Sequence, residues 1–289
     1  IPKNILPKSA KIIAIISGKG GVGKSNVTYN LASKMAKKGK KVAIIDADVY
    51  GYSIPKIANT YEEPKVIDNM IQPIVSKEGI EIISTQYFIE HNENKPIVWR
   101  GPILNKLMNN FFNNVEFSKD LDYIFIDMPP GTGDIMLNLS VYLDDVSCIL
   151  VTTANHDASH VAVRSGVLAK ELKFEMLGVI ENMSHFICPN CDDKHYIFGD
   201  GGAKKISEQF KIPFLGEIPL NYGIMSGSDL GKPIMSTDTN SPSADAFRSS
   251  AKNVAAQCSI IASNLQEEME SETNESESTS DTPTSENTS

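Results

Sequence analysis

The chain has 289 residues, which suit one large α/β domain or two small ones, and a single P-loop favours one. Hydrophobic residues make up 41% of the chain, enough for a core. Its net charge of −9 comes mostly from eight Asp and Glu residues between Glu267 and Glu286, so the remainder carries only −1. A body this close to neutral argues against a nucleic-acid-binding surface, and no apolar run is long enough to span a bilayer. We therefore expect neither nucleic acid nor membrane as a partner.

The four cysteines follow no apolar secretory segment, which predicts a reducing compartment where thiols act as ligands more often than as disulfides. We expect a cytoplasmic location, with an organelle matrix or stroma as the alternative. Residues 1–10 carry two prolines and are predicted to be a linker, and residues 11–266 form the predicted domain. Residues 267–289 are rich in Ser, Thr and Glu with almost nothing apolar, so we expect a disordered tail.

The run Ser17–Ser25 matches the P-loop pattern G-x-x-x-x-G-K-[ST], which binds the phosphates of a nucleoside triphosphate. Its four glycines let successive backbone N–H groups turn toward phosphate oxygens, while Lys24 adds positive charge and Ser25 offers a hydroxyl to Mg²⁺. A buried strand is predicted before it, at Lys11–Ile16, and a helix after it, at Asn26–Lys38. The residues expected to contact ATP here are Gly18, Lys19, Gly20, Gly21, Val22, Gly23, Lys24, Ser25 and Asn26.

Two further predicted strands, Lys41–Ile45 and Asp122–Asp127, lead to acidic residues at their carboxyl ends. Asp46 and Asp48 follow the first strand, and Asp127 closes the second, where a Walker B carboxylate holds Mg²⁺ through its water shell. Ligands of open α/β sheets bind beyond the carboxyl ends of the strands, so these acids are expected beside the P-loop.

The turn-rich run Met128–Asp134 comes next, where a γ-phosphate sensor belongs, with a plain surface loop as the other interpretation. Later apolar runs predict four more strands, Ile80–Ser84, Ser147–Thr152, Leu177–Ile180 and Phe214–Ile218. Together the strands predict a doubly wound α/β fold of the P-loop NTPase type, with about seven mainly parallel strands in a single domain.

The end of the domain is predicted to be a loop over Pro233–Asn240 and then one long helix. Apolar residues repeat along that helix at steps of three and four, which marks a core-facing side. They are Ala244, Phe247, Ala251, Val254, Cys258, Ile261 and Leu265. Cys258 on this side, and Cys148 inside a strand, are expected to be packing residues.

Cys188 and Cys191 form a C-x-x-C loop, which supplies two of the four thiolates that a metal or cluster site needs. A two-fold dimer would bring both pairs together into a Cys₄ site, which suits Zn²⁺ and a [4Fe–4S] cluster equally. The spacing leaves two other interpretations open, a redox dithiol and a zinc site within one chain that uses His185 or His195.

The extra Lys19 inside the P-loop resembles the deviant P-loop of the MinD, ParA, ArsA and nitrogenase-reductase superfamily. This P-loop and four other segments follow one another in the order found in the Mrp/ApbC family, which the chain resembles from about Lys11 to about Leu265. The other segments are Asp46-Ala47-Asp48, Trp99-Arg100-Gly101-Pro102, Asp127–Asp134 and Glu181–Cys191. The chain departs from the family pattern at Tyr52, where the family usually has proline, and at Asn155-His156, where Pro-Gln is typical.

This resemblance implies a homodimeric ATPase with a MinD-like fold of the SIMIBI class that receives [4Fe–4S] clusters from scaffold proteins and transfers them to apo-proteins. Cys188 and Cys191 would hold the cluster at the dimer interface, and Asn182 would contact adenine. Lys19 would reach the nucleotide of the partner subunit and act in catalysis with Lys24 and Asp48. Asp48 would position the attacking water.

By the same resemblance, Asp46 would help to order the Mg²⁺ shell. Three other functions remain as hypotheses: a spatial-organising ATPase like MinD or ParA, an electron-transfer ATPase like nitrogenase reductase, and an ATPase with a zinc-bridged dimer. The acidic C-terminus argues against the first, because membrane-targeting members need a basic amphipathic end. The single C-x-x-C argues against the second, whose two ligands lie on separate loops.

Overall fold

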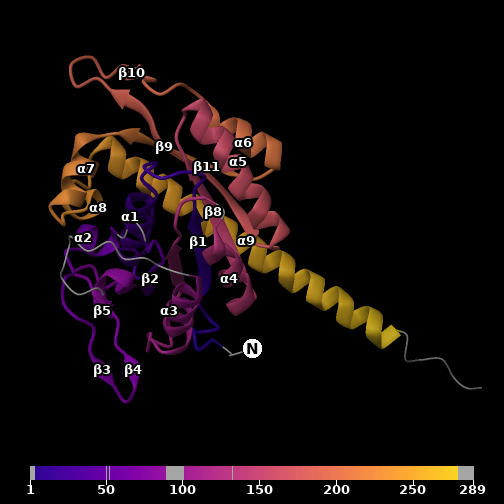
Figure 1. The fold of residues 1–289 in the computed structure, drawn as a ribbon. Coiled ribbons are helices and arrows are strands. Elements are labelled where there is room, and N and C mark those ends of the chain that lie inside the picture. Colours follow the sequence, from indigo (N-terminus) through magenta and orange to yellow (C-terminus); the bar gives the residue numbers. More distant parts are fainter. Residues whose placement is uncertain (1–3, 50, 52, 89–100, 132, 279–289) are drawn as a thin grey trace, which may run out of the picture.

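The structure is a computed structural model that describes residues 4–49, 51, 53–88, 101–131 and 133–278. The predicted segment Trp99-Arg100 and the family departure at Tyr52 lie outside these residues. Figure 1 shows a central sheet with helices on both sides.

Among the described residues, the parallel strands of the sheet are β1 Lys11–Ile16, β2 Val42–Asp46, β6 Glu81–Ser84, β7 Tyr123–Asp127, β8 Val146–Thr152, β9 Glu175–Ile187 and β11 Phe214–Leu220. These seven strands lie side by side in the order β11, β9, β8, β1, β7, β2, β6. Short antiparallel strands extend the sheet, β5 (Ile74–Val75) beside β6 and β10 (Lys194–His195) beside β9, while β3 (Val66–Ile67) and β4 (Met70–Ile71) form a separate hairpin. The predicted doubly wound, mainly parallel sheet is confirmed.

Buried side chains alternate between two cores, one on each face of the sheet. In β1, for example, Ala14 and Ile16 belong to one core and Ile13 and Ile15 to the other. The first core lies under α3 Gly101–Asn113, α4 Asp134–Tyr142, α5 His156–Glu171 and α6 Gly202–Phe210. The second lies under α1 Lys24–Ala36, α2 Ile54–Ala58, α7 Tyr222–Asp229, α8 Ile234–Thr237 and α9 Pro242–Ser278.

Several element boundaries differ from the sequence-based expectation. Strand β9 runs well past the predicted Leu177–Ile180, and the segment predicted to be a loop at Pro233–Asn240 contains α8. No helix was expected at the positions of α2, α3, α4, α6 and α7, whereas the helix expected at Asn26–Lys38 lies within two residues of the bounds of α1. Gly39 adopts φ +80°, as expected of a residue that follows a helix in the left-handed conformation.

The C-terminal helix continues beyond the predicted domain boundary at residue 266. Phe247 and Val254 are fully buried on its inner side, whereas Figure 1 shows its last turns leaving the body of the protein. Residues 267–278, part of the segment expected to be disordered, continue this helix in the structure. Glu, Gln and Met favour helix, and adding residues to a helix already held by packing avoids the cost of nucleation. The structure does not describe residues 279–289.

Within the described part of the chain, no helix combines the length and apolarity needed to cross a membrane.

We expect a variant that ends at Gln266 to unfold within about 2 °C of the full chain, because the removed helical turns project from the body. A matched variant that ends at Asn253 also loses Val254 and Cys258 from the core, and its melting temperature should fall by about 5 °C or more. Differential scanning calorimetry of the three proteins measures both effects. An equal fall in melting temperature in the two variants would contradict a domain boundary at residue 266.

Candidate functional site

Polar side chains meet where three neighbouring parallel strands end. Asp46 closes β2, and the sheet register pairs it with Asp127 at the end of β7 and with Ser84 at the end of β6. The P-loop leaves the adjacent strand β1 at the same edge. The predicted convergence of the P-loop and the acids is therefore confirmed.

The P-loop wraps the start of α1 with two glycines in the left-handed region, Gly21 at φ +79° and Gly23 at φ +78°. Gly18 packs so closely on α5 that an added Cβ would lie 2.3 Å from the backbone nitrogen of Ala162. A cleft of about 520 Å³ opens beside the loop. Its walls come from the P-loop, the segment after β2 and the predicted γ-phosphate sensor, and include Gly20, Gly21, Asp48, Gly51, Pro129, Pro130, Gly133 and Asp134.

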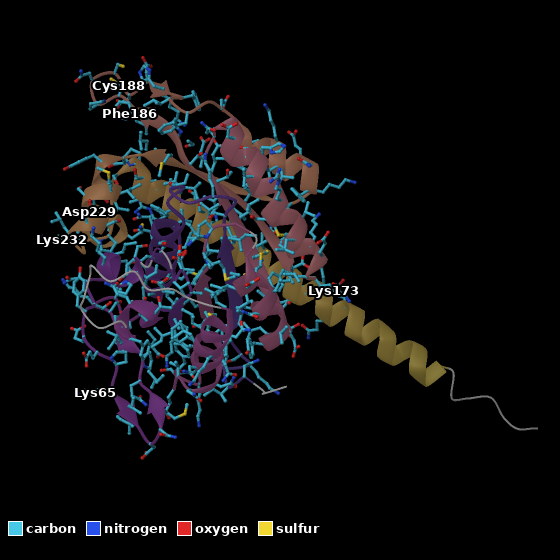
Figure 2. The ribbon with its side chains drawn as sticks, viewed as in Figure 1. Lys65, Lys173, Phe186, Cys188, Asp229 and Lys232 are labelled. Atoms are coloured by element: carbon cyan, nitrogen blue, oxygen red, sulfur yellow. The ribbon has the colours of Figure 1, made fainter. Side chains whose placement is uncertain are left out.

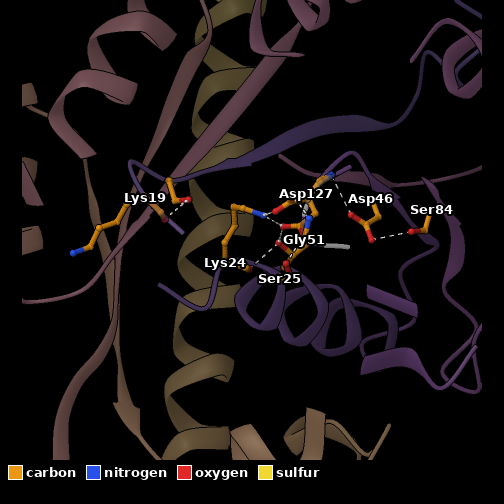
Figure 3. A network of polar contacts seen from close by, with 10 residues as sticks. Lys19, Lys24, Ser25, Asp46, Gly51, Ser84 and Asp127 are labelled. Carbon is orange, nitrogen blue, oxygen red and sulfur yellow. Dashed lines mark hydrogen bonds and ion pairs between the residues drawn. The ribbon is translucent and has the colours of Figure 1, made fainter. Parts of the chain in front are cut away.

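Lys24 is buried and lies in a cluster of charges (Figure 3), where it lines a smaller pocket of about 190 Å³ formed mainly by the P-loop. Its Nζ is 2.9 Å from Oδ1 of Asp127 and 3.6 Å from Oδ2 of Asp48. The Ser25 hydroxyl donates to Oδ2 of Asp127 at 2.5 Å. Hydroxyl and carboxylate oxygens are the donors that Mg²⁺ prefers, so Ser25 and Asp127 suit this ion.

Thr28 is a member of this cluster that the sequence motifs did not reveal. Its hydroxyl donates to Oδ1 of Asp127 at 2.9 Å, and the side chain is fully buried. The signal was present as helical spacing, because Thr28 follows Lys24 by four residues and so lies on the same face of α1.

Asp46 and Asp48 differ in their surroundings although they are two residues apart. Asp46 is fully buried and accepts hydrogen bonds from Ser84 and from the backbone N–H of Asp48. Burial, together with the nearby charge of Asp127, raises the pKa of Asp46 to about 8. Asp48 instead borders the cleft and accepts a hydrogen bond from the backbone N–H of Gly51 at 3.0 Å.

Lys19 is exposed, and Figure 3 shows its side chain directed away from Lys24 and Asp127. The structure thus does not bring Lys19 into the charge cluster of its own chain.

Asn182, predicted to contact adenine, contacts the P-loop itself. Its Nδ2 donates to the carbonyl of Val22 at 2.8 Å, and an added Cβ on Gly23 would lie only 2.2 Å from that nitrogen. Met183, the next residue of β9, adopts φ +53°, which side-chain-bearing residues rarely do. Asn26, another predicted nucleotide contact, accepts a hydrogen bond from Ser228 of α7.

Strand β9 leads directly to the C-x-x-C loop, which forms the turn of the hairpin between β9 and β10 (Figure 2). The backbone N–H of Cys188 donates to the carbonyl of Asp193, and that of Asp192 donates back to the carbonyl of Cys188, both at 2.9 Å. The backbone N–H groups of Asn190 and Cys191 donate to the sulfur of Cys188 and lower the pKa of its thiol. A stabilised thiolate at an exposed turn suits a soft metal ligand.

The described residues contain no group of three or more His, Cys, Asp and Glu side chains placed to hold a metal ion. His185 is buried, with Nδ1 hydrogen-bonded to the Ser184 hydroxyl at 2.9 Å, and His195 is exposed on β10. The zinc site within one chain is therefore not assembled here. Cys148 and Cys258 are buried, as predicted.

We expect the ligand-free protein to lose stability as the pH rises from about 4 to about 8, the interval in which the folded form retains a proton on Asp46 that the unfolded form has lost. Asp46→Asn replaces the carboxyl group with an amide of similar shape that does not titrate. Its unfolding free energy relative to the wild type should therefore increase with pH over the same interval, as measured by urea titration. A constant difference from pH 5 to pH 8 would contradict the raised pKa.

We expect Gly23→Ala to weaken nucleotide binding by tenfold or more (about 1.4 kcal/mol), because the new methyl group would displace Asn182 from Val22. Gly39→Ala is the matched control, since Gly39 has φ +80° but a Cβ added to it would meet no atom within 4 Å. It carries the same backbone strain and should bind a fluorescent ATP analogue as the wild type does. Equal affinity in the two variants would argue against the close contact.

Comparison with known proteins agrees with this geometry. Residues 8–255 match the family ParA, described as NUBPL iron-transfer P-loop NTPase. An iron-sulfur cluster carrier protein of Bacillus subtilis is 40% identical over 248 residues, which cover 86% of this chain and 69% of that protein. The protein of the same name from Saccharolobus solfataricus is 36% identical over 244 residues, or 84% of this chain and 82% of the relative.

Solved structures share the fold. A nucleotide-binding protein from Archaeoglobus fulgidus in complex with ADP is 35% identical, with a TM-score of 0.66 over 77% of this chain and 87% of that one. MinD from Pyrococcus furiosus, at 20% identity and a TM-score of 0.62 over 86% of this chain and 99% of its own, shows likeness of fold alone. On the family match and the identities above, this chain belongs to the NUBPL iron-transfer P-loop NTPases of the ParA family.

Proposed function

We propose that the chain is an ATP-hydrolysing iron-sulfur cluster carrier that receives a [4Fe–4S] cluster from a scaffold protein and delivers it to apo-proteins. The observation that most supports this function is the pair Cys188 and Cys191, held in the loop that directly follows the strand whose Asn182 contacts the P-loop. Relatives at 36–40% identity bear the name iron-sulfur cluster carrier protein. A reducing compartment, the cytoplasm or else an organelle matrix or stroma, suits such exposed thiols.

The cluster would lie between two copies of the chain, since each contributes two thiolates and a cubane cluster takes four. Large apolar side chains surround the hairpin and are exposed in the single chain. They are Phe186, Tyr196, Ile197 and Phe198, each between 38% and 59% exposed. Burying them against a second copy would stabilise the dimer that completes the thiolate set.

ATP hydrolysis in this proposal uses the charge cluster beside the cleft. Lys24 and the N–H groups of the P-loop would neutralise charge on the transferred phosphoryl group, with Lys19 of the partner subunit adding a second positive charge. Ser25 and Asp127 would hold Mg²⁺, which supplies further charge neutralisation when bound. Asp48 would orient the attacking water, and with few groups acting directly on that water we expect hydrolysis to be slow.

The test is anaerobic reconstitution with iron and sulfide, followed by absorption spectroscopy and metal analysis. We expect a broad band at about 400 nm and about four iron atoms per dimer in the wild type. Cys188→Ala with Cys191→Ala should lose both signals, because the other two cysteines, Cys148 and Cys258, are buried. Stoichiometric zinc without a cluster, or a cluster that persists in this variant, would refute the proposed carrier function.

The matched control replaces the two buried cysteines instead, Cys148→Ala with Cys258→Ala. Their thiols have raised pKa values because burial disfavours the thiolate, so they should not ligate the cluster. This variant should keep the full iron content while losing some stability. Loss of iron from the control alone would show that the ligands had been assigned to the wrong pair.

A further inference from the structure

Ser84 ends β6 and lies beside the nucleotide site without touching the cleft. Its hydroxyl donates to Oδ2 of Asp46 at 2.9 Å, and its oxygen accepts the backbone N–H of Gln86 at 3.2 Å. Both Ser84 and Asp46 are completely buried. The Gln86 contact fixes the hydroxyl group, so it presents its hydrogen to Asp46 in a defined direction.

The other carboxylate oxygen of Asp46 makes the next contact. Oδ1 accepts the backbone N–H of Asp48 at 3.2 Å, closing an Asx-turn that fixes the path of the chain as it leaves β2 (Figure 3). Asp46 is thus held by one donor from β6 and one from its own loop. If the Ser84 donor were missing, the Asp46 side chain could rotate and the turn would lose its anchor.

This turn fixes the backbone of Asp48 and so sets the direction of its side chain. Its carboxylate borders the cleft, 3.6 Å from Lys24, and accepts the N–H of Gly51 at 3.0 Å. The carboxylate therefore reaches the nucleotide side of the loop, while its own backbone N–H faces the buried Asp46. A small rotation of the Asp48 peptide would move its carboxylate along the cleft.

We propose that Ser84 is a positioning residue for ATP hydrolysis, which holds Asp46 so that Asp46 anchors the Asp48 peptide and directs the Asp48 carboxylate toward the nucleotide. The inference rests on the water-orienting role proposed above for Asp48. It adds a residue outside the P-loop and outside both acidic motifs. Its location follows from the parallel register that pairs Asp46 with Ser84.

Steady-state ATPase kinetics of the full chain test this role. Ser84→Ala should lower kcat about tenfold or more, because misplacing a catalytic group by a fraction of an ångström is costly, while KM and fluorescent-nucleotide affinity should change less than about threefold. Ser84→Thr keeps the hydroxyl and should recover most of kcat. Ser250→Ala is the matched control, a fully buried serine whose hydroxyl has no hydrogen-bond partner among the described residues, and it should keep the wild-type kcat.

The outcomes separate this inference from the proposed role of Asp48, which Asp48→Asn tests directly. If Asp48→Asn lowers kcat but Ser84→Ala does not, the role of Ser84 is refuted and that of Asp48 stands. If Asp48→Asn leaves kcat unchanged, the water-orienting role fails and the inference fails with it. If Ser84→Ala lowers kcat only together with nucleotide affinity and melting temperature, and Ser84→Thr does not restore kcat, Ser84 is a packing residue and the inference is overturned.

Discussion

The buried contact between Lys24 and Asp127 is the interaction on which the nucleotide site depends. Removing two charges from water is costly, and this pair is tolerable because Ser25 and Thr28 supply further hydrogen bonds to the same carboxylate. Nucleotide phosphates would compete with Asp127 for Lys24, and the two hydroxyls would remain to satisfy the carboxylate. Lys24 would therefore exchange one anionic partner for another, while Asp127 would keep the hydrogen bonds from Ser25 and Thr28.

Much of this site could be predicted because its signals are local. The P-loop glycines, and acids placed directly after apolar runs, locate Lys24, Asp46 and Asp127 before any tertiary contact is known. Parallel pairing then brings the strand ends together. Ser84 was predicted as a strand residue but not as part of the site, because its role depends on which strand lies beside β2. The topology of the fold decides which strand that is. A serine at the end of a strand belongs to no sequence motif that would reveal its role.

Other features could not be predicted from the sequence, for different physical reasons. Helix α7 carries two glycines in a short segment and shows no clear helical pattern. Helix α6 does place Ala203, Ile206 and Phe210 at helical spacing, but it begins within the glycine-rich run Gly199–Gly202, which favours a turn. The tail composition predicted disorder, but the helical state of 267–278 is continuous with a packed helix rather than formed alone. The contact of Asn182 with Val22 also depends on tertiary structure, since 160 positions separate the two residues.

Strand β9 connects the nucleotide site to the C-x-x-C loop. Asn182 donates to the P-loop carbonyl of Val22, and the strand ends at Ile187, directly before Cys188. Between them, Met183 has a left-handed backbone, and the pairing with β11 shifts register over the same stretch, which are the marks of a bulge that redirects a strand. A left-handed methionine costs free energy that the surrounding contacts must offset. The P-loop contact and the loop that holds the thiols are therefore joined by a strand with one strained residue between them.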